Sequence, residues 1–331
     1  MPELYVTNYN PHFTGVSATA ATVIRQQLGR YDLALVGHPL PGCPAPLSRS
    51  DAHQMSRYAP SDKPFAIWHV RRNPEMRSAI WLRDIRRAPI KIVFTSAAQR
   101  LHSAYPRWLI SRMDAVIATT DKAAEYVPHV RAVVPHGVDT DVFHPADNRA
   151  AAWVALGYGG THGIATIGRI RPEKGTDVFV DAMVHLLPQH PGKVALVIGR
   201  AGGKFEPFLR GLKAKVIAAG LADRHLFVGE IPATDLPPLM RALSLVVQLP
   251  RYEGYGMVPL EALASGVPFV GSDAGYYRKF SDTGRVGSIV ALDPIAASHA
   301  AAAWLSHDDP ATLSATTRSI ATTQFLSLIH I

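Results

Sequence analysis

Residues 163–187 carry the pattern that decides the fold. They read Gly163-Ile164-Ala165-Thr166-Ile167-Gly168-Arg169-Ile170-Arg171-Pro172-Glu173-Lys174-Gly175, followed by Thr176-Asp177-Val178-Phe179-Val180-Asp181-Ala182-Met183-Val184-His185-Leu186-Leu187. A short apolar strand (164–167) runs into a turn rich in glycine and basic residues, and a helix is expected over 176–187. Such a turn holds anions well, because free backbone N–H groups and the helix dipole point at it. Arg169 offers a fork that matches phosphate oxygens, and Lys174 offers a mobile point charge. Taken alone, the pattern fits a surface turn with incidental charges equally well, and the Walker pattern is absent.

A second glycine-bearing turn follows the apolar run 243–249. It reads Glu253-Gly254-Tyr255-Gly256-Met257-Val258-Pro259-Leu260-Glu261-Ala262-Leu263-Ala264-Ser265-Gly266-Val267-Pro268. Its glycines allow close approach of the backbone to a ligand, and the expected helix aims its N-terminus at that ligand. Glu253 precedes the helix and Glu261 lies within it, so the two carboxylates can reach different parts of one extended ligand. A helix cap with a solvated Glu261 explains each glutamate separately, but it does not explain why the cradle recurs after two strands.

Apolar, β-branched runs alternate with helical stretches along the whole chain. The runs are residues 4–7, 33–36, 65–70, 90–95, 115–119 and 132–135 in the first half, and 163–168, 194–199, 226–229, 243–249, 267–271 and 286–291 in the second. Near-continuous apolar strands separated by helices predict parallel sheets that are buried on both faces. We therefore expect an α/β fold of two Rossmann-like, doubly wound parallel-sheet domains that face each other across a cleft. The domains are assigned to residues 1–150 and 151–331.

Composition indicates an ordinary globular protein and excludes several other classes. The chain has 331 residues, of which 47% are hydrophobic and 18% charged, as expected for two folded domains. The N-terminus lacks the features of a signal peptide, and no run of about 18 apolar residues exists. We expect a cytoplasmic protein that is at most peripheral on a membrane. The single cysteine, Cys43, has no CxxC spacing and is interpreted as a loop residue in a reducing compartment.

The formal net charge of +8 is concentrated in one region. Ten basic residues lie between Arg71 and Arg112, and only Glu75 and Asp84 oppose them within that range. The basic residues are Arg71, Arg72, Arg77, Arg83, Arg86, Arg87, Lys91, Arg100, Arg107 and Arg112, with Trp81, Tyr105 and Trp108 among them. The region fits a solvated helical face, or a patch that meets an anionic membrane surface or an anionic acceptor. No nucleic-acid motif accompanies it, so a nucleic-acid partner is not expected.

The two turns together resemble the signature of the family 4 glycosyltransferases, which have the two-domain GT-B fold. That family shows G-R-x-x-P-E-K-G followed by E-G-[FY]-G-x-x-x-x-E-A-x-A-x-G-x-P, and both stretches are present here with the spacing from Glu253 to Glu261 kept. The stretch 136–145, with His136 in place of the usual asparagine, resembles the family's N-G-V-D-x-x-x-F-x-P linker. The resemblance covers about residues 90–290, and it rests on the combination rather than on any one motif.

The resemblance implies roles for individual residues. Arg169 and Lys174 would hold the donor diphosphate and stabilise the leaving group, and Glu253 would touch the donor sugar. The remaining donor-binding residues would be Gly254, Tyr255, Gly256 and Met257 through their backbone, Glu261 at the ribose, Val228 at the nucleobase, and Gly15 in the first domain. His69 follows a strand and would face the cleft as a catalytic residue, although a lone histidine is more often structural.

The expected chemistry needs no cofactor and no essential metal. Glycosyl transfer places negative charge on the departing diphosphate, which fixed cations and N–H dipoles can stabilise. The family retains the anomeric configuration, and no carboxylate is assigned as a covalent nucleophile. Asp139-Thr140-Asp141 matches the D-x-D of metal-dependent transferases, but it lies in the linker pattern and is interpreted as a false match. The histidines show no metal-ligand spacing.

Segments 8–19 and 68–73 are similar to those of α-proteobacterial lipopolysaccharide core mannosyltransferases. The similarity implies GDP-mannose as donor, the lipid-linked anionic inner core as acceptor, and a place on the inner face of the inner membrane. Family members usually end in a helix that crosses back to the N-terminal domain. Here residues 326–331 are apolar without an amphipathic pattern and resemble a truncated or non-native end.

Other functions remain open at this point. A sugar-nucleotide epimerase of the same fold would need no acceptor. A dehydrogenase is disfavoured because no GxGxxG follows the first strand, and a phosphorylase would need a cofactor lysine. A non-catalytic basic protein that binds the membrane surface through the Arg71–Arg112 region would show salt-dependent binding that Glu253→Ala leaves unchanged.

Overall fold

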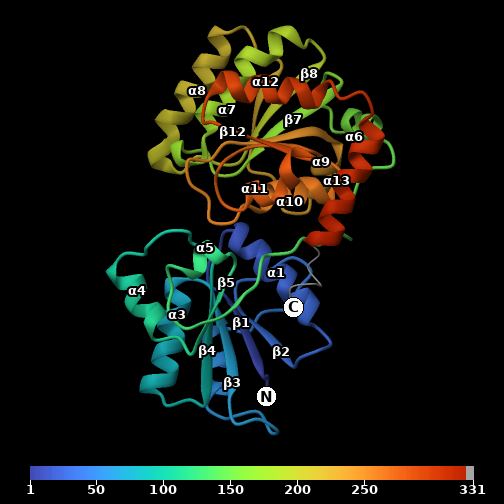
Figure 1. The fold of residues 1–331 in the computed structure, drawn as a ribbon. Helices are drawn as coiled ribbons and strands as arrows, with labels where there is room; N and C mark the ends of the chain where they lie inside the picture. Colours follow the sequence, from blue (N-terminus) through green and yellow to red (C-terminus); the bar gives the residue numbers. More distant parts are fainter. Residues whose placement is uncertain (326–331) are drawn as a thin grey trace. The chain divides into compact units, whose positions relative to one another are not determined.

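The chain forms two compact units, each built on a six-stranded parallel sheet. The computed structural model describes residues 1–325, so the apolar end at residues 326–331 lies outside the described residues. The first unit is Met1–Gly137, and the second begins at Val138. Figure 1 shows helices on both faces of each sheet. The expected α/β fold with two Rossmann-like doubly wound domains is confirmed.

The first unit has the strand order β2-β1-β3-β4-β5-β6. Its strands are β1 (Leu4–Asn8), β2 (Leu33–Gly37), β3 (Ala66–Val70), β4 (Ile90–Ser96), β5 (Ala115–Ala118) and β6 (Val130–Val133). Its helices are α1 (Gly15–Gln27), α2 (Arg49–Met55), α3 (Asn73–Ile80), the π-helical turn η1 (Trp81–Ile85), α4 (Ala104–Ser111) and α5 (Asp121–Ala124). Helix α1 packs on one face of the sheet through Ala20 and Ile24, and α3 packs on the other through Met76 and Ile80.

The second unit has the strand order β12-β11-β10-β7-β8-β9. Its strands are β7 (His162–Ile167), β8 (Lys193–Ile198), β9 (His225–Gly229), β10 (Leu243–Gln248), β11 (Phe269–Ser272) and β12 (Gly287–Val290). Its principal helices are α6 (Arg149–Ala155), α7 (Thr176–Leu186), α8 (Glu206–Ala218), α9 (Leu236–Ala242), α10 (Met257–Ala264), α11 (Tyr277–Phe280), α12 (Pro294–Leu305) and α13 (Pro310–Gln324). Helices α7, α8 and α12 cover one side of this sheet, and α9, α10 and α11 cover the other (Figure 1).

All twelve strands lie where the apolar runs predicted them. The largest shifts are two residues: β6 begins two residues before the expected run at 132, and β11 begins two residues after the expected run at 267. The helix expected over 176–187 ends at Leu186, where a 3-10 turn containing Pro188 takes over, because proline cannot donate the next helical hydrogen bond. No helix within residues 1–325 combines the length and apolarity needed to cross a bilayer.

In each sheet, the direction in which successive strands are added reverses at one point. These switch points indicate where a ligand can bind. In the first unit β1 lies between β2 and β3, and in the second β7 lies between β8 and β10. At a switch point, the loops that follow two neighbouring strands turn to opposite faces of the sheet. A crevice forms between these loops, at the carboxyl ends of the strands. A ligand site is therefore expected after β1 and β3, and after β7 and β10.

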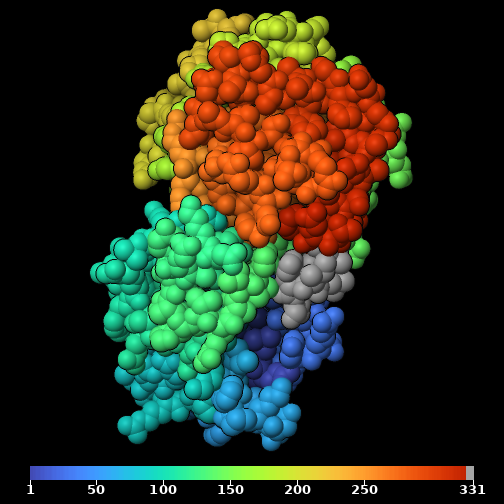
Figure 2. Space-filling model, viewed as in Figure 1, coloured from blue at the N-terminus to red at the C-terminus, as the bar shows by residue number. Residues whose placement is uncertain are grey.

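Residues 138–150 pack with the second unit, so the boundary expected between residues 150 and 151 falls too late. The Arg318 guanidinium on α13 donates to the carbonyl oxygens of Thr140 (2.9 Å) and Phe143 (2.6 Å). Arg149 donates to the carbonyl of Gly266 (2.7 Å). These bonds tie the linker to α10 and α13, which pack against each other. The C-terminal segment that contains α13 is red in Figure 2 and covers one side of the second unit. The sequence pattern marked the linker but could not show which unit would satisfy its carbonyl groups.

Arg318 also donates to the Ala264 carbonyl at the end of α10 (2.7 Å), so one guanidinium satisfies three carbonyl groups. We expect Arg318→Met to lower the free energy of unfolding by about 2–4 kcal/mol, because it leaves these acceptors without their charged donor. Urea denaturation followed by circular dichroism measures the change. Arg210→Met, on the exposed side of α8, is the matched control and should change stability by less than about 0.5 kcal/mol. Equal denaturation midpoints for both variants would refute this role for Arg318.

Candidate functional site

The two glycine-bearing turns meet at the carboxyl edge of the second sheet. The first turn follows β7 and the second follows β10, and these strands are hydrogen-bonded neighbours. Because the strands are parallel, both turns leave the same edge of the sheet. An ion pair joins them directly, with Lys174 Nζ 2.6 Å from Glu253 Oε2. The structure thus brings together two residues that lie 79 positions apart in the sequence.

Glycine at position 175 is what allows the first turn to lie against β10. Its backbone is left-handed, with φ of 66°, a conformation that costs other residues free energy. A Cβ atom there would lie 1.7 Å from the carbonyl oxygen of Leu249, just after β10. The turn therefore needs glycine for both its conformation and its packing. This contact explains why the glycine that ends the first motif matters for the site.

Arg251 joins the two turns a second time, and the sequence analysis missed it. Its guanidinium pairs with both oxygens of Asp177 at the start of α7, at 2.8 and 2.7 Å, and also donates to the carbonyl of Pro172. Its backbone N–H donates to the carbonyl of Glu173 (3.0 Å). Asp177 lies just after the first motif and Arg251 just before the second. No local pattern distinguishes either residue from a surface charge.

Arg169 is exposed at the same edge of the sheet, directly after Gly168. Partial burial lowers the pKa of its guanidinium, the neighbouring Arg171 lowers it further, and Glu253 and Glu173 oppose the shift. The cationic groups of Arg169 and Lys174 and the carboxylate of Glu253 therefore act on one small region. Together with the start of α7, this region has the charges and N–H groups that a diphosphate requires.

The second turn is held rigidly around Gly256. Gly256 has φ of 92°, and a Cβ atom there would lie 2.1 Å from the Tyr277 ring. Tyr255 is buried and stacks on Tyr276 with 5.2 Å between ring centroids. Glu253 accepts a hydrogen bond from the N–H of Gly254 (3.0 Å). The backbone of Gly254 through Met257, where α10 begins, is thus fixed beside the Glu253 carboxylate.

Glu261 is buried within α10, with 6% of its surface exposed. The interpretation of this residue as a solvated helix glutamate is therefore wrong. Burial raises the pKa of its carboxyl group from 4.5 to about 7. A carboxyl group buried in this way is suited to accept or share hydrogen bonds with a polar ligand.

Val228 lies on the edge strand β9 at a break in the ladder. Val197 of β8 pairs with Phe227, and Ile198 pairs with Gly229, so Val228 is the extra residue of a bulge. The backbone of such a residue takes no part in the regular ladder and can hydrogen-bond elsewhere. This geometry agrees with a backbone contact to a nucleobase.

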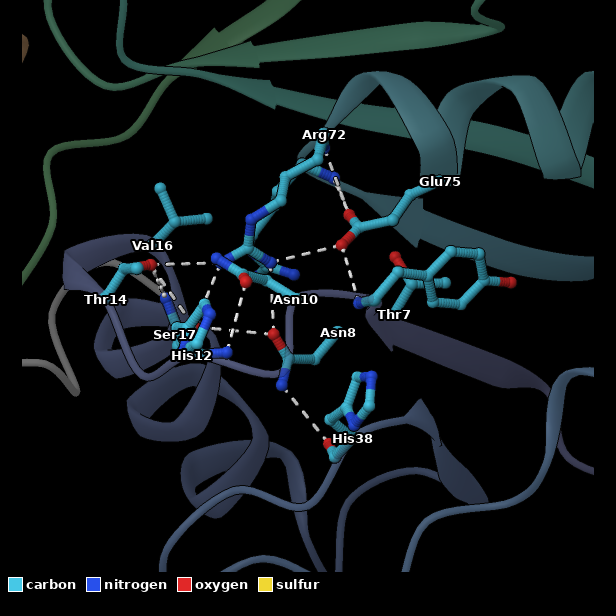
Figure 3. Close-up of polar contacts among 12 residues, drawn as sticks. Thr7, Asn8, Asn10, His12, Thr14, Val16, Ser17, His38, Arg72 and Glu75 are labelled. Atoms are coloured by element: carbon cyan, nitrogen blue, oxygen red, sulfur yellow. Dashed lines mark hydrogen bonds and ion pairs between the residues drawn. The ribbon is translucent and has the colours of Figure 1, made fainter. Parts of the chain in front are cut away.

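In the first unit, the loop that carries Gly15 is held by Arg72 (Figure 3). The Arg72 guanidinium donates to Thr14 Oγ1 (3.1 Å) and Ser17 Oγ (2.9 Å) at the start of α1. It also donates to Asn8 Oδ1 (3.1 Å) at the end of β1. Gly15 is exposed as the first residue of α1, and Thr14 caps that helix. One side chain from the end of β3 therefore fixes the turn after β1, across the switch point of this sheet.

Glu75, which is fully buried, compensates the charge of Arg72. Its carboxylate accepts from the Arg72 guanidinium (3.1 Å) and from the backbone N–H groups of Tyr9 (3.0 Å), Arg71 (2.8 Å) and Arg72 (3.0 Å). Four donors saturate this carboxylate, as a buried charge requires. Counting Glu75 and Arg72 in a surface patch was therefore wrong, because both belong to an internal network.

His69 lines a cavity of about 180 Å³ at the carboxyl edge of the first sheet, together with Arg71 and Thr95. Its Nε2 lies 2.7 Å from Thr95 Oγ1 and its Nδ1 lies 3.5 Å from an Arg71 nitrogen. Burial lowers the pKa of His69 well below 6.5, with further contributions from Arg71 and His136. The ring is therefore neutral at pH 7. A second cavity of about 210 Å³, beside His53 and Trp81, is lined by α2 and η1 rather than by loops after strands.

The rest of the basic region is partly compensated by a residue outside it. Asp114 pairs with Arg83 (2.7 Å) and Lys91 (3.1 Å), and Asp84 pairs with Arg83 (2.7 Å) and Arg112 (2.6 Å). Within residues 1–325, the exposed Arg77, Arg86 and Arg107 form no ion pair. The exposed surface charge is therefore smaller than the sequence count suggested.

The Asp139-Thr140-Asp141 stretch and Cys43 are two further features that the sequence analysis singled out. The Asp139 carboxylate accepts from the backbone N–H groups of Asp141 and Val142 (both 3.2 Å), so the D-x-D match shapes a turn. Cys43 is a free thiol whose pKa is raised by burial. In the part of the chain that the structure describes, no cluster of three His, Cys, Asp or Glu side chains is arranged to hold a metal.

Two parallel α/β sheets with binding loops at their carboxyl edges define the GT-B class of glycosyltransferases. Crystalline HepE from Anabaena, in complex with UDP and glucose, has the same fold, with a TM-score of 0.82 over 99% of this chain and 97% of that one. Sequence identity to HepE is 15%, so this similarity shows the fold alone.

Sequence comparison identifies the family. Residues 158–320 match the family described as glycosyl transferases group 1. The lipopolysaccharide core biosynthesis mannosyltransferase LpcC of Rhizobium leguminosarum bv. viciae is 43% identical over 292 residues, which are 87% of this chain and 82% of that protein. LpsB of Rhizobium meliloti (strain 1021), of the same description, is 41% identical over 327 residues, 97% and 92% of the two chains. The chain belongs to the group 1 glycosyltransferases and is a glycosyltransferase.

Glu261 generates a prediction about pH and stability. Since its pKa is higher in the folded protein than in the unfolded chain, the folded state holds the proton more tightly. Its contribution to stability is present below pH 4.5 and is lost as the pH rises through about 7. Glu261→Gln cannot lose a proton, so its free energy of unfolding relative to wild type should increase across this window, by up to about 3 kcal/mol. Denaturant titrations at several pH values measure it.

Glu206→Gln, exposed in the first turn of α8, is the control and should follow the wild-type profile. If Glu261→Gln also follows the wild-type pH profile, the burial-raised pKa does not control stability.

Proposed function

We propose that this enzyme transfers mannose from GDP-mannose to the anionic inner core of lipopolysaccharide, with retention of the anomeric configuration, as a family 4 glycosyltransferase. Two relatives that are 43% and 41% identical over most of both chains are described as lipopolysaccharide core mannosyltransferases. The observation that carries the donor site is the meeting of the two turns, joined by the Lys174–Glu253 ion pair. The second unit is then the donor-binding domain, and the first binds the acceptor.

The proposal assigns a role to each site residue. Arg169, Lys174 and the start of α7 neutralise the diphosphate. Glu253 binds sugar hydroxyls and Glu261 binds the ribose. The backbone of Gly254, Tyr255, Gly256 and Met257 contacts sugar and phosphate, and the Val228 backbone binds the nucleobase. In the first unit, Gly15 is assigned to donor binding and His69 to catalysis.

Fixed cations supply the electrostatic stabilisation. As the bond between the sugar and the diphosphate breaks, negative charge grows on the leaving group, and Arg169 and Lys174 are already in place to offset it. No metal and no cofactor take part in this proposal. Lys174 is paired with Glu253 here, so an incoming diphosphate competes for the Lys174 ammonium and releases the Glu253 carboxylate for the sugar.

Glu253→Gln tests the donor site. It removes the charge and keeps the shape, so we expect kcat to fall about a hundredfold or more, in the range found when one transition-state contact is removed. The assay follows mannose transfer from GDP-mannose to purified lipid-linked inner core. Glu230→Gln, which removes an exposed carboxylate paired with Arg200, is the control and should retain activity.

Further measurements test the metal independence, the choice of donor and the need for an acceptor separately. Transfer should persist in EDTA, and GDP should raise the melting temperature more than UDP or ADP does. Turnover of a UDP-sugar but not of GDP-mannose would overturn the choice of donor. Conversion of the nucleotide sugar without acceptor would favour an epimerase.

We also propose that the first unit meets the anionic inner face of the inner membrane, at the surface around α4. Tyr105 and Trp108 on α4 are 51% and 54% exposed and stack on each other, and Leu101 nearby is 60% exposed. Arg107, which lies between them in the sequence, is exposed on the same helix. Aromatic side chains beside basic ones are typical of surfaces that enter the headgroup region of an anionic bilayer.

Vesicle sedimentation tests this surface. The double variant Tyr105→Ser, Trp108→Ser should bind phosphatidylglycerol vesicles several-fold more weakly than wild type, because each ring contributes buried apolar area. Tyr58→Ser, which removes an exposed ring outside the Arg71–Arg112 region, is the control. Binding that equals wild type in the double variant would place the membrane contact elsewhere.

A further inference from the structure

Arg71 is a half-buried residue whose guanidinium group is largely enclosed, and its charge is not matched by a direct ion pair. Its Nε and Nη1 atoms are buried and have no hydrogen-bond partner among residues 1–325. Its third nitrogen, Nη2, lies 3.5 Å from His69 Nδ1, which is at the limit of a hydrogen bond. Burial lowers the pKa of the Arg71 guanidinium only to about 10, so it remains charged at pH 7. A buried guanidinium without acceptors is costly, and such groups commonly mark a ligand site.

The nearest carboxylate is already occupied. Glu75 accepts from the backbone N–H of Arg71 but receives its guanidinium partner from Arg72, and its four bonds leave it saturated. The two adjacent arginines therefore differ: the Arg72 guanidinium forms a direct ion pair with Glu75, whereas the Arg71 guanidinium feels the charge of Glu75 without bonding to it. Both Arg71 and the cavity that it lines belong to the first unit.

His69 and Thr95, which neighbour Arg71, form a chain of hydrogen bonds that ends in a further donor. Because Arg71 can only donate, its contact with His69 Nδ1 favours the neutral tautomer that carries its proton on Nε2. His69 Nε2 then donates to Thr95 Oγ1 (2.7 Å), which leaves the Thr95 hydroxyl proton free to donate. Thr95 lines the same cavity. Arg71 and Thr95 thus present several donors to one space.

An acceptor group completes the cavity. Gln27, at the end of α1, also lines it, and its Oε1 atom is buried without a hydrogen-bond partner. A cluster of donors around a fixed positive charge matches an oxyanion, and a single acceptor beside it matches a hydroxyl group. One molecule that carries both groups in a compact space is an acidic saccharide. The cavity volume of about 180 Å³ leaves room for several polar atoms of such a ligand.

We infer that this cavity is a subsite for the acceptor, in which Arg71 binds the carboxylate or phosphate of an acidic sugar, Thr95 donates to it and Gln27 accepts from a hydroxyl. The identification of the ligand as the acceptor rests on the proposed function, and the subsite specifies which part of the anionic acceptor is recognised. The anion-binding property itself rests only on the geometry of the first unit.

Direct binding tests the subsite without any transfer reaction. The probes are glucuronate for a carboxylate, glucose 6-phosphate for a phosphate, and glucose as the neutral control, each titrated at millimolar concentrations by calorimetry. Wild type should bind at least one acidic probe more tightly than glucose. Arg71→Gln should weaken that binding about tenfold or more, as expected for loss of a charge-assisted hydrogen bond. Arg30→Gln, which removes an exposed arginine at the end of the α1 region, should bind like wild type.

Two further variants keep the test independent of folding defects. Arg71→Lys retains the charge and should retain part of the affinity for the acidic probe. Gln27→Glu changes one atom and places a competing carboxylate on the cavity wall, so it should weaken acidic probes more than glucose. Thermal unfolding confirms that each variant is folded. Equal affinities of wild type, Arg71→Gln and Gln27→Glu for the acidic probes, or no preference of wild type for any acidic probe, would overturn the inference.

Transfer kinetics then distinguish this inference from the proposed function. With the acidic acceptor, Arg71→Gln should raise the acceptor KM about tenfold or more and leave the KM for the donor unchanged. With an acceptor whose acidic groups are methyl-esterified, wild type and Arg71→Gln should become equal. Anion binding that depends on Arg71, in a wild-type enzyme that transfers no mannose, would support the subsite and refute the proposed donor or acceptor. A normal transferase with an unchanged acceptor KM in Arg71→Gln would refute the subsite alone.

Discussion

The adjacency of β7 and β10 is the constraint on which the proposed donor site depends. Because these strands are parallel neighbours, residues that follow them must emerge at the same edge of the sheet. Two contacts follow from that placement: the 2.6 Å pair between Lys174 and Glu253, and the packing of Gly175 against the Leu249 carbonyl. If another strand lay between β7 and β10, strand spacing alone would separate the two turns by nearly 5 Å more.

The first unit repeats this principle with different chemistry. Its switch point lies between β1 and β3, and Arg72 bridges the two loops there through Asn8 and Thr14 (Figure 3). The second unit joins its loops through the partly exposed ion pair of Lys174 and Glu253. The first joins them through a network closed by the fully buried Glu75. A network satisfied in this way gives a rigid loop, which suits a surface that must hold a substrate in one orientation.

Sequence reasoning predicted the strands and the two turns well because their signals are local. Apolar runs, glycines and helix starts depend on a few neighbouring residues, and parallel topology then brings the turns together. It failed where the decision depends on distant partners. Nothing near Arg251 shows that Asp177 and the carbonyls of the first turn are its partners. Likewise, nothing near Glu261 shows that α10 buries it, since its charge alone favours exposure.

Arg71 and Arg72 show most clearly how far charge counting can mislead. In the sequence they are identical neighbours within a basic region, and both were counted toward a surface patch. The fold turns them into two different groups, because Glu75 has a fixed number of acceptor positions and Arg72 takes the side-chain share. What remains for Arg71 is a charge held beside His69 with buried donors that no residue in 1–325 satisfies. The basic character of this region is therefore directed partly inward, and an anionic substrate is a more economical explanation of Arg71 than an anionic surface.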